Sequence, residues 1–369
     1  MTRSKIALCL PGGGATGAMY QIGALAALEH AIEGFDATAL DLYVGASSGA
    51  SVAATLAAGR PIERMYRAFL DPADAYFPLE RRHVLQTDGA EWRRTVTTAL
   101  GALAHGARSF VGRPPLSPAE LWEELDRFND SLPAGVLSLE AYERFLDGFF
   151  VRRGIPQAFS KLPRPLRILA HDLDSGEKAL FGAPGLEHVP ITRACIASMA
   201  VPPFFSPVRI GDRHYIDAGA AQVSMLELAI DAGAEVVVVV NPMVPVNVSR
   251  VPTGHGRRSS VRDKGLLWVA NQAIRISLHT LLREAVARVT RGGRAEVLLL
   301  EPDAADGILF MYSPASFAAR RNLLESGYKT TRARVARLLE EQAPAVTRAG
   351  FVPRARESQP RSHPPGAGG

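Results

Sequence analysis

At 369 residues, 47% of them hydrophobic, the chain is long enough to bury one sizeable core or two modest ones. Its two cysteines, Cys9 and Cys195, exclude a disulfide framework and lack metal-ligand spacing, and the acidic residues are scattered, so we expect neither a metal nor a cofactor. The net charge is +5, but only five of the 42 basic residues are lysine, and we attribute this arginine bias to genome composition rather than to nucleic-acid binding.

The first predicted strand runs from Ile6 to Leu10 and leads into a glycine-rich loop, after which a helix is expected from Ala18 to Glu33. Within the loop, the consecutive glycines Gly12, Gly13 and Gly14 leave several backbone N–H groups unshielded. Such groups can stabilise the oxyanion of a tetrahedral intermediate. The loop is therefore a candidate oxyanion hole.

The apolar run that follows the basic N-terminus is only five residues long, which is too short for the hydrophobic part of a signal peptide. No stretch of the chain reaches the length of a membrane span. We therefore expect a cytoplasmic protein that contacts membranes only from the side.

The same loop also fits the dinucleotide-binding pattern G-x-G-x-x-G through Gly12, Gly14 and Gly17. That pattern needs an acidic residue at the end of the second strand to hold the ribose. Here the acidic residue, Asp41, lies at the start of the second strand, which ends at Ser47. Nucleotide binding is thus the less favoured alternative.

A second candidate motif follows the apolar run Leu40–Val44, which predicts a buried strand, and precedes a predicted helix from residue 50 to 58. Between them, Gly45, Ser47 and Gly49 match G-x-S-x-G at a strand-to-helix junction, the context of a nucleophile elbow. The glycines permit a strained turn. The serine hydroxyl lies at a helix N-terminus, where amides and the helix dipole favour developing negative charge. A plain serine-capped turn is the alternative.

From residue 61 to about 165 helical patterns dominate, and we expect a helical insertion that covers the site. A strand then returns at Leu166–Ala170, followed by a short helix at Ile191–Met199 and a hairpin from Val208 to Asp217. Asp217 ends this hairpin just before a glycine turn. An aspartate there could accept the proton of the Ser47 hydroxyl.

A histidine base of the α/β-hydrolase kind is a second alternative, because His255 and His279 follow Asp217 in the chain. However, His255 lies in a loop rich in proline, glycine and arginine, and His279 lies within a predicted helix. His214 is three residues from Asp217 on one strand, so the two side chains are expected on opposite faces. The elbow also comes too early in the chain for that fold.

The strongest strand signal is Glu235–Val240, which is apolar on both faces as a central parallel strand requires. Residues 245–264 are expected to form a mobile basic loop that could contact an anionic membrane surface. The cations of this loop are Arg250, Arg257, Arg258, Arg262 and Lys264.

A long helix is expected from Leu266 to Val289, with one apolar stripe that we assign to the core rather than to membrane docking. A strand at Glu296–Leu300 and a helix at Phe317–Glu341 follow, and residues 343–369 are predicted to be a disordered tail. The stripe consists of Leu267, Ala270, Ile274, Leu278, Leu281 and Ala285.

Glycine loop, serine elbow and late D-x-G, in this order, resemble the patatin-like phospholipases. The segments Ala170–Gly176 and Ala197–Pro207 are also similar to that family, and the resemblance extends from about Ile6 to Pro242. The sequence differs from the family pattern at Thr16, where a basic residue is usual, and at Ala218, where a glycine is usual.

The resemblance implies a three-layer α/β/α fold with a mostly parallel central sheet, in one domain spanning residues 5–342. It also implies that a lipid ester, of a phospholipid or lysophospholipid, is hydrolysed through an acyl-enzyme by a dyad of Ser47 and Asp217. The implied oxyanion donors are Gly12, Gly13 and Gly14, and the motif glycines are Gly17, Gly45, Gly49 and Gly219. A non-catalytic lipid-binding or regulatory module is the remaining alternative, which the presence of serine, aspartate and glycine loop together disfavours.

Overall fold

A computed structural model describes residues 4–84, 132–247, 260–302 and 317–354, with a few positions between 86 and 126. Its centre is an eight-stranded sheet of order β11-β10-β1-β3-β6-β9-β8, with β7 also paired to β6. The strands are β1 Ile6–Leu10, β3 Leu42–Ala46, β6 Leu166–Asp172, β7 Lys178–Phe181, β8 Val208–Ile210, β9 Arg213–Asp217, β10 Val236–Val240 and β11 Glu296–Leu300.

Neighbouring strands from β11 to β6 are parallel, whereas β7 and β9 pair antiparallel with β6, and β8 pairs antiparallel with β9. The predicted mostly parallel α/β fold is therefore confirmed. Every residue of β1, β3 and β10 is buried, because helices cover both faces of a parallel sheet.

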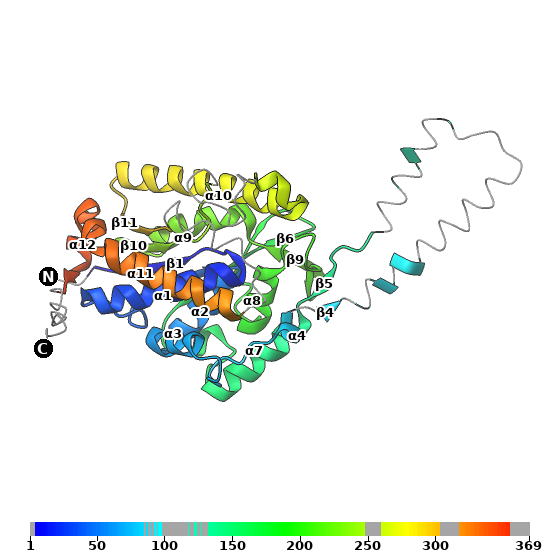
Figure 1. The fold of residues 1–369 in the computed structure, drawn as a ribbon, viewed down its shortest axis with the longest axis horizontal. Coiled ribbons are helices and arrows are strands. Elements are labelled where there is room, and N and C mark those ends of the chain that lie inside the picture. The colour runs from blue at the N-terminus through cyan, green and yellow to red at the C-terminus, as the bar shows by residue number, and fades with distance from the viewer. Residues whose placement is uncertain are drawn as a thin grey trace, which may run out of the picture.

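The sheet separates two hydrophobic cores, and β1 contributes to both by alternation: Ile6 and Leu8 enter one core, Ala7 and Cys9 the other. Figure 1 shows α9 and α10 over one face of the sheet and α1, α2 and α8 over the other. The helices of this three-layer arrangement are α1 Gly14–Ala31, α2 Ser48–Ala57, α8 Ile191–Met199, α9 Met225–Asp231 and α10 Leu266–Arg291.

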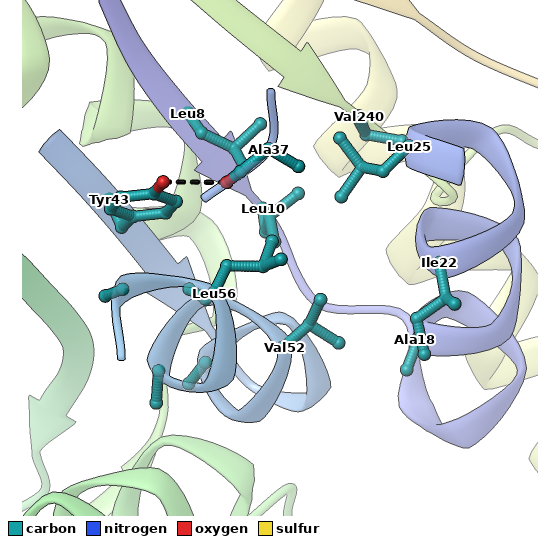
Figure 2. Close-up of a cluster of buried hydrophobic side chains, with 14 of the residues drawn as sticks. Leu8, Leu10, Ala18, Ile22, Leu25, Ala37, Tyr43, Val52, Leu56 and Val240 are labelled. Atoms are coloured by element: carbon teal, nitrogen blue, oxygen red, sulfur yellow. Dashed lines mark hydrogen bonds between the residues drawn. The ribbon is translucent and has the colours of Figure 1, made fainter. Parts of the chain in front are cut away.

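Helix α1 is buried on nearly all sides because α11 (Phe317–Glu341) packs directly over it. A Cβ on Gly23 would lie 2.1 Å from the carbonyl oxygen of Leu324, so glycine is required where the two helices touch. Figure 2 shows Ile22 of α1 and Val52 of α2 in one cluster of buried side chains, with the Tyr43 hydroxyl donating to the Ala37 carbonyl at 2.7 Å. This packing places the N-terminal ends of α1 and α2 side by side.

Part of the predicted insertion, residues 61–165, lies outside the described residues. The described elements are α3 Ile62–Leu70, α4 Arg81–Val84, α7 Glu140–Arg153, a short 3-10 helix at Phe159–Lys161, and a two-stranded ribbon of β4 Gln86–Thr87 and β5 Leu137–Ser138.

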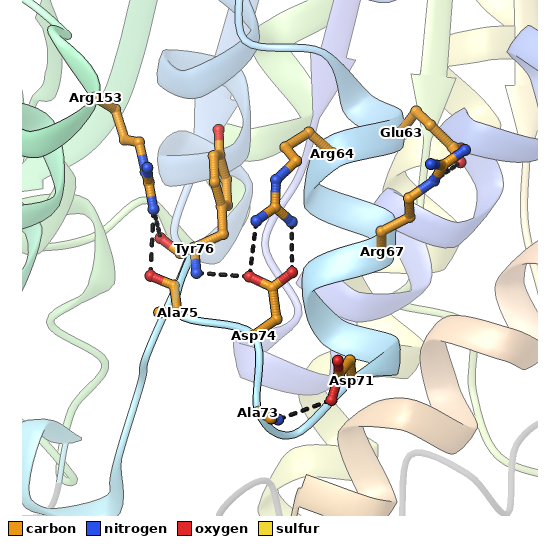
Figure 3. A network of polar contacts seen from close by, with 9 residues as sticks. All are labelled: Glu63, Arg64, Arg67, Asp71, Ala73, Asp74, Ala75, Tyr76 and Arg153. Atoms are coloured by element: carbon orange, nitrogen blue, oxygen red, sulfur yellow. Dashed lines mark hydrogen bonds and ion pairs between the residues drawn. The ribbon is translucent and has the colours of Figure 1, made fainter.

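A polar network fixes the chain that leaves α3 (Figure 3). Arg64 contacts both carboxylate oxygens of Asp74 at 2.7 and 2.8 Å, and it lowers the pKa of that carboxyl. The guanidinium groups of Arg64 and Arg153 both lie over the ring of Tyr76, at 4.4 and 4.2 Å from its centroid. This turn leads directly to Phe77, which packs on the apolar face of α7.

The long helix α10 is present, but the predicted core-facing stripe is only partly correct. Leu278 and Ala285 are buried, whereas Ile274 and Leu281 are 42% and 41% exposed. The buried face also includes Leu282. Apolar residues occur on every side of this helix, so periodicity alone does not select the side that meets the sheet.

The prediction of a disordered tail from residue 343 is wrong for its first part. Residues Ala343–Ala349 form α12, and β12 (Val352–Pro353) pairs with β2 (Ile32–Glu33). Phe351 is buried against Phe35, with ring centroids 5.4 Å apart. Residues 355–369 lie outside the described residues, as do residues 248–259 of the predicted basic loop. Ser260 and Asp263 form a capping box at the start of a 3-10 helix, Val261–Lys264.

Candidate active site

The glycine loop and the serine elbow follow neighbouring strands. Strands β1 and β3 are parallel partners, with Leu10 opposite Gly45, so the turns that follow them emerge at the same edge of the sheet. A Cβ on Gly12 would lie 2.4 Å from the Cβ of Ser47, so only a glycine allows the loop to pass this close to the serine.

Ser47 has φ 51° and ψ −132°, and among the described residues it is the one non-glycine residue with positive φ. Such a conformation costs about 1–3 kcal/mol and is typical of functional sites. The motif glycines make the turn possible: a Cβ on Gly49 would lie 2.1 Å from the carbonyl oxygen of Leu10, and one on Gly45 would lie 2.6 Å from the Cα of Ala50. Both elbow glycines are therefore required by close backbone approach, as predicted.

Strand register brings Asp217 to the elbow. Ala46 is opposite Leu169 in the β3–β6 pair, and Asp217 is opposite Ala170 in the β6–β9 pair. Ser47 and Asp217 therefore lie level with each other, separated by the single strand β6. With neighbouring strands about 4.8 Å apart, their side chains can meet above β6.

The carboxyl group of Asp217 is held on one side only. Oδ1 accepts the N–H of Gly219 at 2.8 Å, and Gly219 has the positive φ of 45° that this turn needs. Oδ2 is buried and makes no hydrogen bond to any described residue. Ala218 has ordinary helical dihedrals, φ −60° and ψ −20°, so alanine in place of the family's glycine causes no strain.

Burial raises the pKa of Asp217, although the Gly219 N–H and then the Ser47 hydroxyl lower it in part. The hydroxyl is therefore close to the carboxyl group, yet it is not aligned in a hydrogen bond with Oδ2. Loose contacts of this kind are common in catalytic pairs before substrate binds. The geometry brings together the two residues that the sequence selected.

Gln222, for which the sequence offered no signal, links the glycine loop to Asp217. Its Oε1 accepts the N–H of Gly12 at 2.7 Å, and its side-chain amide lies close enough to Asp217 to lower the pKa of that carboxyl. Because the Gly12 N–H is already occupied, the candidate oxyanion donors narrow to Gly13 and Gly14. Gly14 begins α1, whose first N–H groups have no partner within the helix.

The loop is otherwise closely packed. A Cβ on Gly13 or Gly17 would lie 2.7 or 2.9 Å from Cγ of Pro242, whereas one on Gly14 would meet nothing within 4 Å. The Thr16 hydroxyl donates to the Gly13 carbonyl at 3.1 Å, so the residue that departs from the family pattern stabilises the loop locally.

A cavity of about 270 Å³ begins at Ser47 and extends between α1, α2, α3 and α7. Its walls are largely apolar, and Figure 2 shows Ala18, Ile22 and Val52 at the α1–α2 contact beside it. Apolar side chains from the insertion, Met65, Phe69 and Phe149, also line the cavity. A larger, open depression between α4 and α7, of about 830 Å³, contains neither Ser47 nor Asp217.

The histidine alternatives find no support among the described residues. His279 contacts Glu301, with Nε2 3.4 Å from Oε1, and His214 contacts Asp174 with Nδ1 3.6 Å from Oδ2. No described histidine lines the cavity at Ser47, and His255 lies outside the described residues.

The dinucleotide alternative also lacks support. A carboxylate oxygen of Asp41 accepts the N–H of Ile6 at 2.8 Å, at the edge of the sheet opposite the glycine loop. Across the described parts of the chain, no three histidine, cysteine, aspartate or glutamate side chains gather where they could bind a metal. Within the same parts, every helix is too short or too polar to cross a membrane.

The family model described as patatin-like phospholipase matches residues 8–230. No curated protein matches the chain. Among solved structures, VipD from Legionella pneumophila is 15% identical, with 92% of this chain and 67% of that chain covered and a TM-score of 0.40.

The type III effector ExoU is 15% identical, with 91% of this chain and 53% of that chain covered and a TM-score of 0.35. For ExoU in its complex with SpcU from Pseudomonas aeruginosa, the identity is 16%, with 92% of this chain and 52% of that chain covered and a TM-score of 0.36. The chain thus spans about half the length of ExoU. With its family match covering glycine loop, elbow and Asp217, the chain belongs to the patatin-like phospholipases, a family of lipid hydrolases.

Proposed function

We propose that this protein is a serine acyl hydrolase that cleaves a carboxylic ester of a phospholipid or lysophospholipid. The observation that carries the proposal is the position of Ser47. The serine is strained, only 4% exposed and at one end of an apolar cavity. Beside it lies Asp217, whose buried Oδ2 has no hydrogen-bond partner among the described residues.

In the proposed reaction, Asp217 accepts the Ser47 proton as Oγ attacks the ester carbonyl carbon. The N–H groups of Gly13 and Gly14 stabilise the resulting oxyanion, each by about 3 kcal/mol. Collapse of the intermediate breaks the ester bond, and the leaving alcohol takes the proton from Asp217. Water, deprotonated by Asp217, then attacks the acyl-enzyme carbonyl carbon. The bond from that carbon to Ser47 Oγ breaks, Asp217 returns the proton to Oγ, and the fatty acid leaves.

The burial of Asp217 suits the role of a base. Burial raises the pKa of Asp217, and a carboxylate with a raised pKa accepts a proton more readily than an ordinary aspartate. Its Oδ2 is buried and has no hydrogen-bond partner among the described residues, so this oxygen is available to the Ser47 hydroxyl once the two groups align.

We assign the cavity to the acyl chain of the substrate. Its apolar walls at Ile22, Val52, Met65 and Phe69 offer hydrocarbon contacts and few hydrogen bonds. The leaving group would then extend from Ser47 away from the cavity.

The central test is labelling with a fluorophosphonate probe, followed by hydrolysis of a panel of lipid esters. We expect Ser47→Ala to abolish both while leaving the folded state intact, because the substitution removes one oxygen. Ser48→Ala is the matched control, since Ser48 is the next residue and is equally buried. Undiminished labelling of Ser47→Ala would place the nucleophile elsewhere. Lipid binding without labelling of the wild type would favour a non-catalytic lipid-binding module.

We further propose that the protein contacts anionic lipid surfaces through α10. Helix α10 packs beside residues 219–224, which follow Asp217, and it exposes large apolar side chains, including Leu266 at 81% and Ile276 at 50%. The exposed cation Arg262 precedes it. Burial of apolar side chains and attraction between cations and anionic lipids together support peripheral binding.

Co-sedimentation with phosphatidylglycerol-containing vesicles tests this contact. Leu266→Ser with Ile276→Ser should weaken binding, whereas Val151→Ser, on α7 and 79% exposed, should not. Hydrolysis of a soluble short-chain ester should be equal in all variants. Equal vesicle binding by the α10 double variant and the Val151 control would refute the assignment.

A further inference from the structure

Ser198, near the C-terminal end of α8, is completely buried and contacts the backbone of the proposed nucleophile. Its Oγ accepts the N–H of Ser47 at 2.7 Å and donates a short hydrogen bond to the carbonyl of Leu169. A hydroxyl has one donor and two acceptor positions, so it can make both bonds at once.

These bonds lie where two strands part. Ala46 and Leu169 are the last paired residues of β3 and β6 on this side, and Ser47 is the first residue beyond them. The Ser198 hydroxyl inserts between the two strands at this point. It connects a donor and an acceptor that no longer reach each other through the strand ladder.

The same short segment also holds the proposed base. The carbonyl of Ala200 accepts the N–H of Asp217 at 3.0 Å. Residues 198–200 therefore contact the backbone of both members of the dyad, one through a side chain and the other through a carbonyl group. Ser47 and Asp217 lie on opposite sides of β6 and have no strand ladder of their own in common.

We propose that Ser198 is a positioning residue that sets the distance and alignment between Ser47 and Asp217. This inference depends on the proposed acyl-hydrolase function. Its physical basis is the strain at Ser47: a backbone in a sparsely populated region keeps that conformation only when surrounding contacts hold it. A misplacement of about 1 Å in a reacting group can cost a hundredfold in rate.

The proposal predicts a split between rate and binding. Ser198→Ala should lower kcat for a soluble ester by about 10- to 100-fold, with KM changed less than threefold, because the cavity is untouched. The rate constant of fluorophosphonate labelling should fall by a similar factor. The pH at which activity reaches half its maximum should not move, since the surroundings of the Asp217 carboxyl are unchanged.

Thr192→Val is the matched control. Thr192 lies on the same helix, is equally buried, and its hydroxyl bonds to Asp147 and Gln157 away from the dyad. Both variants remove one buried hydroxyl and should reduce thermal stability. Only Ser198→Ala should lower kcat and the labelling rate of the folded protein.

A second variant covers the case in which Ser198→Ala does not fold. Ser198→Cys keeps a weaker donor and acceptor at the same position, with a somewhat larger side-chain atom, and it should show an intermediate loss of rate. The inference is overturned if folded Ser198→Ala or Ser198→Cys labels and turns over as fast as Thr192→Val. Failure of the wild type to label would instead refute the proposed function itself.

Discussion

The serine elbow and the glycine loop are both glycine-rich turns between a strand and a helix, yet their glycines have different roles. At the elbow, Gly45 and Gly49 are each in backbone contact, and the strain is carried by Ser47. In the loop, Gly14 itself has a positive φ of 63° and open space around it. The elbow holds one side chain rigidly, whereas the loop is closely packed at Gly12, Gly13 and Gly17 and open at Gly14.

The largest expected effect concerns Asp217, which both turns face: the elbow directly and the loop through Gln222. Asp217→Asn removes the base and should reduce kcat by about 1,000-fold or more, because a general base contributes about 100- to 10,000-fold and this one also activates the nucleophile. His279→Ala should keep most of the activity. Loss of activity in a folded His279→Ala would revive a histidine base.

The pH dependence of hydrolysis by the wild type is a second test of Asp217 as the base. Because the pKa of Asp217 is raised in the folded state, hydrolysis should decline as the pH falls through a value above that of an ordinary aspartate. The stability of the folded state changes with pH in the opposite direction to the activity. From the unfolded pKa up to the raised folded pKa, rising pH favours the unfolded state, in which the carboxyl ionises freely.

Asp217→Asn should remove this penalty, so the variant should unfold at a higher temperature than the wild type near neutral pH and lose that advantage in acid. Thermal unfolding and kcat/KM measured from pH 4 to 8 check both statements. A decrease of kcat/KM that is centred at the ordinary aspartate pKa, about 4, would contradict them.

The next largest effect is expected from a substitution that disrupts the packing of the elbow. Gly49→Ala places a Cβ 2.1 Å from the Leu10 carbonyl oxygen, and backbone cannot move away cheaply. We expect a loss of stability of about 3 kcal/mol or more, measured by chemical denaturation, together with loss of fluorophosphonate labelling. A fully stable Gly49→Ala would mean that the elbow is less tightly packed than described.

A smaller effect isolates the strain in the elbow. Ser47→Gly and Ser47→Ala both remove the hydroxyl, but only glycine accepts φ 51° and ψ −132° without steric cost. After the entropic cost of glycine is subtracted, Ser47→Gly should be about 1 kcal/mol more stable than Ser47→Ala. Equal unfolding midpoints would show that the turn is not strained.

The smallest effect belongs to the loop. Gly14→Ala meets no atom within 4 Å and should cost only about 1 kcal/mol for its left-handed backbone, with the N–H retained. Activity on a short-chain ester should stay within about tenfold of wild type. Gly12→Ala is the matched variant: its Cβ would meet that of Ser47 at 2.4 Å, so labelling should be lost. Equal activity and labelling of Gly12→Ala and Gly14→Ala would show that Gly12 is no more closely packed than Gly14.

Much of the framework was predictable because its signals are local. The buried run of β10, the helix Ile191–Met199 and the hairpin ending at Asp217 depend on neighbouring residues and turn chemistry, and the structure confirms them. The start of the tail was mispredicted because α12 is short and is stabilised by distant contacts, such as Phe351 against Phe35. The face of α10 was mispredicted because its apolar residues surround the helix.

By itself, the sequence predicted strands β1, β3, β6, β10 and β11, the two glycine-rich turns and the candidate residues Ser47 and Asp217, because glycine spacing and strand-to-helix junctions are properties of short segments. Only the tertiary structure decided how that pair is held. Gln222 reaches Gly12 across 210 positions of the chain, and Ser198 reaches Ser47 across 151. A lone serine or glutamine in a sequence has no periodicity to mark it, and it acquires a role only when strand register and helix packing bring a specific backbone group within about 3 Å.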